Sequence, residues 1–309
     1  MEKRMLFLFN PTAGKGKIKA HLWEIVDIFN KGGYEVIIHA TQCSRDAYEQ
    51  VKIYEDQVDL IVCSGGDGTL DEVVTGLVEK NSNTPVGYLP AGSTNDFANS
   101  LFMPRDIVEM ARNIMEEVPY CCDIGKFNES TFVYVAAFGL FTEVSYATDQ
   151  ELKNTLGHLA YLLEGLKSLV DIKAYHMKIS SDELTVEDDF IYGMITNSRS
   201  VGGFRNLTGK NVDMDDGLFE VTLIARPRNP LELNEIVTAL VTATDNTELV
   251  HTFKTSHLNI ETEETVAWTL DGEFGGNVRD AEIRIMRKGL NLYLRSTKKR
   301  KNIEEKENE

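Results

Sequence analysis

Three short segments rich in glycine and small residues have the composition of phosphate-binding loops. They are residues 10–16, 65–69 and 90–96. Each follows an apolar run that predicts a buried strand and precedes a helical pattern, so N–H groups at a helix N-terminus would face each loop. Glycine lets the backbone approach phosphate oxygens closely, and the hydroxyls of Thr12 and Thr69 add donors. Any one segment could be an ordinary turn, but three of them favour phosphate binding.

Several other catalytic patterns are missing from the chain. The P-loop pattern G-x-x-x-x-G-K-[ST] does not occur, and Lys19 stands where the third glycine of G-x-G-x-x-G would follow Gly14 and Gly16. There is no G-x-S-x-G nucleophile elbow, and the six histidines lack the spacing of zinc ligands. The sequence therefore disfavours a Walker NTPase, a Rossmann dehydrogenase, a serine hydrolase and a zinc enzyme.

The N-terminal part of the chain predicts an α/β domain over residues 1–122. Strand and helix signals alternate, and repeated β-α units of this spacing imply a doubly wound parallel sheet covered on both faces. Ligands then sit at the carboxyl ends of the strands, where the three loops begin. The expected strands are 5–9, 34–40, 60–63 and 85–89, and the expected helices are 18–29, 46–54, 70–78 and a helix from residue 95 onward.

From about residue 122 the pattern changes to short strands bounded by turn residues. This predicts an antiparallel, β-rich and sandwich-like second domain over residues 123–295, followed by a charged tail over 296–309. The expected strands are 131–138, 176–180, 190–198, 218–224, 258–261, 266–270 and 281–286, and the expected helices are 154–169 and 230–243.

Composition limits the possible locations and partners. The 309-residue chain carries a formal net charge of −17, which disfavours nucleic acid binding. Against that background Lys15, Lys17 and Lys19 cluster near the first loop, and the run at 298–301 is interpreted as a solvated end. Four cysteines without C-x-x-C spacing, no complete signal peptide and no membrane-length apolar run predict a cytoplasmic protein.

The motifs resemble a known family. Gly-Gly-Asp-Gly-Thr at 65–69 precedes Leu-Asp-Glu at 70–72, with Asn-Pro-x-Ala-Gly at 10–14 and Gly-Ser-Thr-Asn-Asp-Phe-Ala at 92–98. This set resembles the diacylglycerol kinase catalytic domain, and more closely the soluble bacterial diacylglycerol and lipid kinases. The resemblance continues at 136–139, 153–157, 213–218 and 271–273, so it covers nearly the whole chain. One departure is Asp71, where the family usually has Asn.

The resemblance implies a kinase of phospholipid metabolism. It implies transfer of a phosphoryl group from ATP, with Mg²⁺, to a lipid alcohol, with diacylglycerol as acceptor and phosphatidic acid as product. The expected partners are that lipid and, transiently, the inner face of the membrane, and the resemblance leaves room for a homodimer.

The resemblance also implies roles for individual residues. Asp67 corresponds to an acidic residue near the ATP phosphates that is linked to magnesium through water, and Glu273 corresponds to the general base. A structural magnesium site corresponds to Asp213, Asp216 and the backbone carbonyl of Leu218. The implied nucleotide-binding residues are Asn10, Pro11, Thr12, Ala13, Gly14, Thr41, Gly66, Asp67, Gly68, Thr69, Leu70, Asp71, Glu72 and Thr94.

The residues by themselves leave alternatives. The segment 213–218 could be a polar turn before a strand, and Glu273 follows Asp-Gly, the strongest short hairpin signal. Asp96 could cap a helix or act in the site, and Asp123 is a further acidic candidate. An NAD kinase, a kinase for another lipid alcohol and a nucleotide-binding regulator without transferase activity are the alternative functions.

Overall fold

A computed structural model describes residues 3–140, 173–201, 212–242 and 247–295. The expected helix 154–169, the motif at 153–157 and the basic run at 298–301 lie outside these ranges. The chain divides into two compact units: unit 1 is Met1–Cys122 together with the residues from Lys288 onward, and unit 2 is Asp123–Arg287. The boundary between Arg287 and Lys288 falls inside one long strand, so the end of the chain belongs again to unit 1.

Unit 1 contains a parallel sheet with the order β2-β1-β3-β4-β15. The long strand β15, Ala281–Leu294, reaches this sheet with its C-terminal part, where Leu292 pairs with Val86. The other strands have the predicted positions within one or two residues at each end. They are β1 Lys3–Phe9, β2 Tyr34–Ala40, β3 Leu60–Gly65 and β4 Val86–Pro90.

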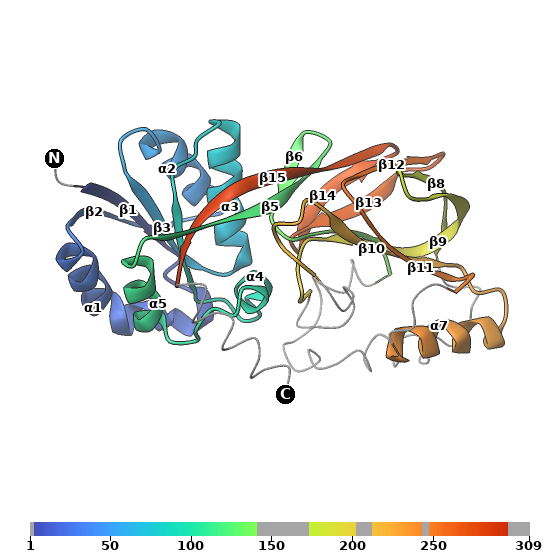
Figure 1. The fold of residues 1–309 in the computed structure, drawn as a ribbon, viewed down its shortest axis with the longest axis horizontal. Helices are drawn as coiled ribbons and strands as arrows, with labels where there is room; N and C mark the ends of the chain where they lie inside the picture. The colour runs from blue at the N-terminus through green and yellow to red at the C-terminus, as the bar shows by residue number, and fades with distance from the viewer. Residues whose placement is uncertain (1–2, 141–172, 202–211, 243–246, 296–309) are drawn as a thin grey trace. The chain divides into compact units, whose positions relative to one another are not determined.

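Helices cover this sheet, as its apolar strands require (Figure 1). Phe7 of β1 and Phe29 of α1 form an edge-to-face pair within a core that also includes Ile114 of α5. The helices α2 and α3 pack closely because α3 has Gly76 where a Cβ would lie 2.9 Å from Val51 of α2. The helices are α1 Lys17–Lys31, α2 Asp46–Tyr54, α3 Asp67–Glu79, α4 Asp96–Ser100 and α5 Ile107–Ile114, with a 3-10 turn, η1, at Ala13–Gly16.

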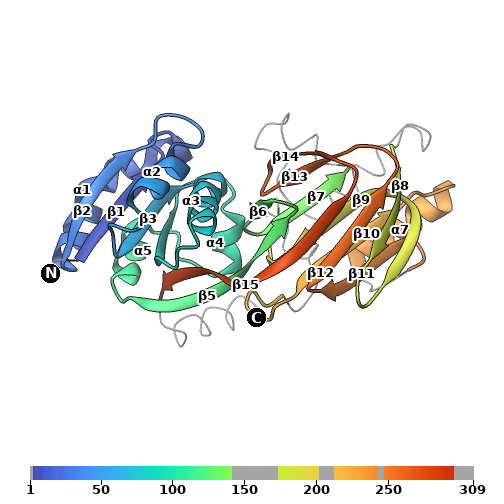
Figure 2. The same ribbon diagram turned by 90° about the horizontal axis from the view of Figure 1, so that it is seen from above.

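Unit 2 is antiparallel at every described strand pairing (Figure 2). An aromatic cluster fills its core, where Trp268 contacts both Phe127 and Phe138. These features confirm the predicted parallel N-terminal part and the β-rich second part. β5, Val118–Phe127, begins in unit 1 and continues into unit 2. The other elements are β6 Ser130–Phe132, β7 Val135–Gly139, β8 Tyr175–Ser180, β9 Thr185–Thr196, β10 Phe219–Ala225, α7 Pro230–Thr242, β11 Val250–Thr255, β12 His257–Thr262, β13 Val266–Leu270 and β14 Glu273–Val278.

Some sequence-based boundaries are wrong, and the largest error has a clear cause. The single strand expected at 131–138 is two strands, because the Asp271 carboxylate accepts the N–H groups of Val133, Tyr134 and Val135 and so interrupts the ladder. The elements α5, β5, β11 and β14 were not predicted. Within the described ranges, no helix combines the length and apolarity needed to cross a bilayer.

Candidate active site

The strand ends of unit 1 bring the three glycine-containing loops to one edge of the sheet. Because β1, β3 and β4 are parallel and in register, Phe9 lies opposite Ser64, and Gly65 lies opposite Pro90. The N–H of Asn10 donates to the Ser64 carbonyl at 2.8 Å. Residues 10–16, 65–69 and 90–96 therefore begin side by side, as parallel β-α topology requires.

Glycine is necessary where these loops touch. Gly14 has a φ of +54°, and a Cβ built on it would lie 2.0 Å from the Ala91 carbonyl oxygen. A Cβ on Gly92 would lie 2.6 Å from the Cα of Gly66. The first and third loops and the second and third loops thus meet backbone to backbone. Loops that pack this closely, without side chains between them, are typical of backbone that lets a phosphate ligand approach.

The first loop is folded by Asn10. Its carboxamide oxygen accepts the Thr12 N–H at 2.9 Å, the Thr12 hydroxyl at 2.8 Å and the Ala13 N–H at 3.2 Å. Pro11, inside this turn, has no N–H to satisfy. The role of Asn10 seen here is therefore to hold the backbone of the loop in shape, and the Thr12 hydroxyl is already engaged with it.

A carboxylate of the second loop binds the backbone of the third loop. Asp67 and Asp96 are the first residues of α3 and α4, and the Asp96 N–H donates to Asp67 Oδ2 at 3.1 Å. Asn95, not Asp96, occupies the cap position of α4, so the capping interpretation of Asp96 is wrong. Burial, and then the charges of Asp67 and Asp96, raise the pKa of Tyr88 well above its usual value. Asp67 and Asp96 thus place negative charge near Tyr88.

Other predicted nucleotide-binding residues of α3 have packing roles. Leu70 is buried, and the Thr69 side chain lies so close to Gly65 that a Cβ there would be 2.2 Å from Thr69 Oγ1. In the third loop the Thr94 carbonyl accepts the side-chain amide of Asn99 at 2.9 Å. Gly68, in the first turn of α3, is half-buried. These contacts fix the start of α3 and the third loop.

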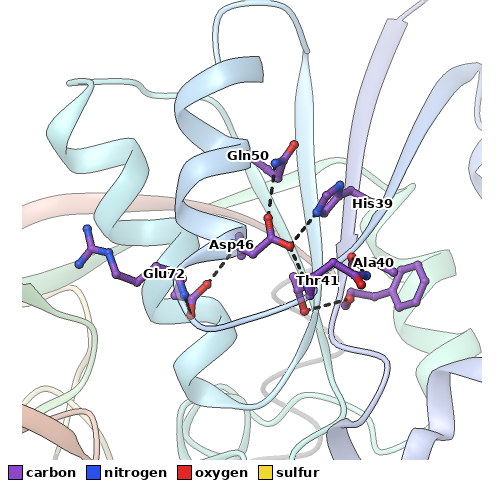
Figure 3. Close-up of polar contacts among 10 residues, drawn as sticks. His39, Ala40, Thr41, Asp46, Gln50 and Glu72 are labelled. Carbon is purple, nitrogen blue, oxygen red and sulfur yellow. Dashed lines mark hydrogen bonds and ion pairs between the residues drawn. The ribbon is translucent and has the colours of Figure 1, made fainter.

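Glu72 anchors a neighbouring helix (Figure 3). Its carboxylate accepts the N–H of Arg45 at 2.7 Å and the N–H of Ala47 at 3.1 Å, at the N-terminus of α2. The side chain therefore satisfies donors that the helix leaves unpaired. Asp71, its neighbour on α3, is half-buried. The family resemblance implies a nucleotide-binding role for Glu72, whereas the described contacts of its carboxylate are with the backbone of α2 and the residue before it.

A second carboxylate organises the segment after β2, where Thr41 lies (Figure 3). Asp46 Oδ2 accepts the Gln42 N–H at 2.7 Å and lies 3.0 Å from His39 Nε2. The hydrogen bond to His39, and then the one from Gln42, hold the pKa of Asp46 below its usual range. Thr41 itself donates its N–H to the Phe9 carbonyl at 2.9 Å, so Thr41 lies beside the end of β1, where the first loop starts.

In unit 2 the segment 213–218 is crowded with carboxylates. Partial desolvation, and then a hydrogen bond with Asp213 and nearby negative charges, raise the pKa of Asp215 to about 6. Asp216 accepts the Leu218 N–H through Oδ1 at 2.9 Å, and its Oδ2 lies 3.1 Å from Lys254 Nζ. Among the described residues, no group of three His, Cys, Asp or Glu side chains is arranged to hold a metal ion. A site built from two carboxylates and a carbonyl would still suit a hard cation.

Asp123 and Asn197 shape this acidic segment. The Asp123 carboxylate accepts the Gly217 N–H at 2.7 Å, and its own N–H donates to the Met214 carbonyl at 2.8 Å. The Asn197 amide donates to the Asp123 carbonyl at 2.6 Å. Asp123 is an acidic candidate of the sequence whose role becomes visible here, whereas Asn197 and Lys254 were not predicted. No local pattern marks the last two, since Asn197 follows β9 and Lys254 lies in β11, both outside the segment that they support.

Glu273 begins β14 immediately after a two-residue turn. Asp271 and Gly272 have φ values of 51° and 86°, and Leu270 pairs with Glu273 across the turn. This confirms the hairpin that Asp-Gly predicts. The Glu273 side chain is exposed, and its carboxylate forms no hydrogen bond or ion pair with another residue in the described ranges. Asp271, in contrast, is buried, and its carboxylate accepts three backbone N–H groups.

Comparison with known proteins identifies relatives across both units. Residues 4–127 match the diacylglycerol kinase catalytic domain, and residues 135–293 match the YegS C-terminal NAD kinase beta sandwich-like domain. The chain is 34% identical over 278 residues to a diacylglycerol kinase of Bacillus subtilis, covering 89% of this chain and 91% of that protein. It is 32% identical to a diacylglycerol kinase of Staphylococcus saprophyticus, over 90% of this chain and 91% of that one.

Solved structures agree with these matches. A crystal structure of a candidate diacylglycerol kinase from Bacillus anthracis superposes with a TM-score of 0.79 at 27% identity, covering 95% of each chain. The fold is thus shared over nearly the whole chain. The chain belongs to the diacylglycerol kinase family.

Proposed function

We propose that this protein transfers the γ-phosphoryl group of ATP to the hydroxyl of diacylglycerol, giving phosphatidic acid, in a Mg²⁺-dependent reaction. Membership of the family supports a lipid kinase. The observation that carries the proposal is the edge of the unit 1 sheet, where the three loops touch backbone to backbone and the Asp67 carboxylate accepts the Asp96 N–H. This edge offers N–H donors to a polyphosphate and oxygen ligands to a hard cation.

The nucleotide would be held mainly by the main chain. Residues 10–14, 66–72 and Thr94, with Thr41 at the neighbouring strand end, are the proposed contacts. Asp67 is the residue proposed to act on the phosphates through a water-linked magnesium ion. When bound, Mg²⁺ offsets the negative charge of the phosphates, which Asp67 and Asp96 would otherwise repel.

Glu273 is proposed as the general base. Its exposed carboxylate forms no hydrogen bond or ion pair with the other described residues, so its oxygens are available to a substrate hydroxyl. A lipid hydroxyl loses its proton only at a pH far above neutrality, so a carboxylate that accepts the proton as the new P–O bond forms lowers the barrier. A second, structural magnesium ion is proposed at Asp213, Asp216 and the Leu218 carbonyl, because oxygen donors of one short segment suit a hard cation.

The decisive experiment replaces the proposed base. In Glu273→Gln, transfer of phosphate from labelled ATP to diacylglycerol in mixed micelles should fall by about a hundredfold or more. Glu264→Gln, an equally exposed change in the turn before β13, is the matched control and should keep full activity. A folded Glu273→Gln protein with normal turnover would remove the base assignment.

A panel of acceptors tests the substrate. Diacylglycerol, sphingoid bases and other lipid alcohols are compared under the same conditions, and NAD is included because the second unit matches an NAD kinase-like domain. We expect diacylglycerol to be phosphorylated fastest. Formation of NADP instead would overturn the proposal, and no turnover with any acceptor would favour a regulatory nucleotide-binding role. The enzyme would act from the cytoplasm as a peripheral protein at the inner membrane face.

A further inference from the structure

The acidic segment 213–218 has a lysine in contact with one of its carboxylates. Lys254 Nζ donates to Asp216 Oδ2 at 3.1 Å and lies 2.9 Å from Glu220 Oε1. The other oxygen of Asp216, Oδ1, accepts the Leu218 N–H at 2.9 Å. One ammonium group is therefore shared by two carboxylates, and both oxygens of Asp216 are engaged.

The sheet of unit 2 fixes the position of this lysine. Glu220 of β10 and Lys254 of β11 are directly opposite each other in an antiparallel ladder, where paired side chains lie on the same side of the sheet. Glu220 is 6% exposed, and a carboxylate so far from water is costly unless a cation accompanies it. Glu220 therefore keeps the ammonium beside the acidic segment, independently of the contact with Asp216.

A second cation lies near the segment but makes a different contact. A Cβ built on Gly217 would lie 2.4 Å from Arg287 Nε, so this guanidinium covers the turn. Arg287 is exposed and forms no ion pair with another residue in the described ranges. Lys254, in contrast, contacts an oxygen of a proposed metal ligand. Of these two cations, Lys254 is therefore the one placed to neutralise Asp216.

We propose that Lys254 is a built-in counter-ion of the acidic segment and that it sets how tightly the segment binds Mg²⁺. The inference rests on the proposed function, which includes a structural magnesium ion at Asp213, Asp216 and the Leu218 carbonyl. A divalent cation on Asp216 and an ammonium 3.1 Å from the same carboxylate would repel each other. Lys254 therefore leaves Asp216 Oδ2 when the metal binds and remains on Glu220, which it already contacts.

The opposite role for Lys254 would be to hold Asp216 ready for the metal. The bond from the Leu218 N–H already orients the Asp216 carboxylate within its own turn, so the ammonium is not needed for that purpose. The two roles predict opposite results when the ammonium is removed. Competition predicts tighter binding of Mg²⁺, and orientation predicts weaker binding.

Calorimetric titration of MgCl₂ into metal-free protein tests the inference. Nucleotide and lipid are left out, so neither catalysis nor the magnesium that accompanies ATP enters the measurement. Lys254→Met should bind Mg²⁺ with a Kd roughly tenfold or more below that of the native chain, because the competing charge is gone. Its unfolding temperature without magnesium should fall by several degrees, because Asp216 and the buried Glu220 lose their shared cation.

Further variants separate the contact from general effects. Lys126→Met is the matched control, because the Lys126 side chain is 33% exposed, against 36% for Lys254, and pairs with Glu129 at 3.6 Å. It removes the same charge from unit 2 and should change neither the Kd nor the unfolding temperature. Lys254→Arg keeps the charge and should not bind Mg²⁺ more tightly than the native chain. Where Lys254→Met does not fold, the double variant with Glu220→Gln removes the unpaired buried carboxylate and should show the same tightening.

Three outcomes would overturn the counter-ion proposal. These are equal or weaker binding of Mg²⁺ by Lys254→Met, equal tightening in Lys126→Met, and binding that survives Asp213→Asn and so takes place elsewhere. No binding by any variant would remove the structural magnesium ion and this inference together. Phosphorylation of diacylglycerol by the native chain is assayed separately. Normal transfer with an unchanged Kd in Lys254→Met refutes the counter-ion role alone, and absent transfer with a tightened Kd refutes the kinase assignment alone.

Discussion

Substitution of Asp271 tests how much one buried carboxylate stabilises the turn before Glu273. Its side chain is buried at 6% exposure, and Oδ1 accepts the N–H groups of Tyr134 and Val135, each at 2.9 Å, while Oδ2 accepts that of Val133. Its own N–H donates to the Val135 carbonyl at 2.8 Å. One carboxylate thus joins the turn that leads to Glu273 with the break between β6 and β7.

The cost of Asp271→Asn follows from these bonds. The amide oxygen can keep the two N–H groups now held by Oδ1, but the amide nitrogen then faces the N–H of Val133, donor against donor. The substitution removes the charge-assisted hydrogen bond to Val133 and leaves the bonds to Tyr134 and Val135 as neutral ones. Together these changes should lower the free energy of unfolding by about 3 kcal/mol. The substitution preserves volume, so the loss measures hydrogen bonding rather than a cavity.

Urea unfolding followed by the fluorescence of Trp268, in the strand that leads into this turn, measures the change. Asp182→Asn, in the exposed turn between β8 and β9, removes the same charge without a described side-chain hydrogen bond and should be neutral within about 0.5 kcal/mol. Transfer to diacylglycerol should also fall in folded Asp271→Asn, because Glu273 follows the turn. An unfolding free energy equal to that of the native protein would refute this reasoning.

Two further predictions concern unit 1. Gly14→Ala would place a Cβ 2.0 Å from the Ala91 carbonyl oxygen, so the first and third loops must separate. The KM for ATP should therefore rise roughly tenfold or more. Gly33→Ala is the control and should leave this KM unchanged, because Gly33 also has a positive φ but a Cβ there would meet nothing within 4 Å. Asp106 caps α5 through two N–H bonds at 2.8 Å, and Asp106→Ala should cost about 1 kcal/mol at neutral pH. The same bonds lower the pKa of Asp106, so its contribution is full above the usual aspartate pKa and is lost as the pH falls through the lowered value. Acid titration of both proteins should show the stability difference vanishing, and a constant difference would contradict the prediction.

Much of the fold was readable from local pattern. The strands β1 to β4 were predicted because their apolar runs are continuous and bounded by glycine, proline or a helical signal. By contrast, β14 is largely exposed or half-buried and includes Gly275 and Gly276, so neither alternation nor apolar content marks it. α5 is short, with eight residues, and a short amphipathic segment is ambiguous without its packing partners.

The sequence by itself determined the chemistry that the chain can offer: three glycine-containing loops at strand ends, a set of carboxylates, and the order of motifs that the family shares. Only the tertiary structure decided what each carboxylate does. Glu72 and Asp271 hold backbone N–H groups, Asp67 meets the start of α4, and Glu273 stays exposed. The physical reason is that a carboxylate is committed by donors from distant segments, and packing, rather than local spacing, brings those donors within hydrogen-bond distance.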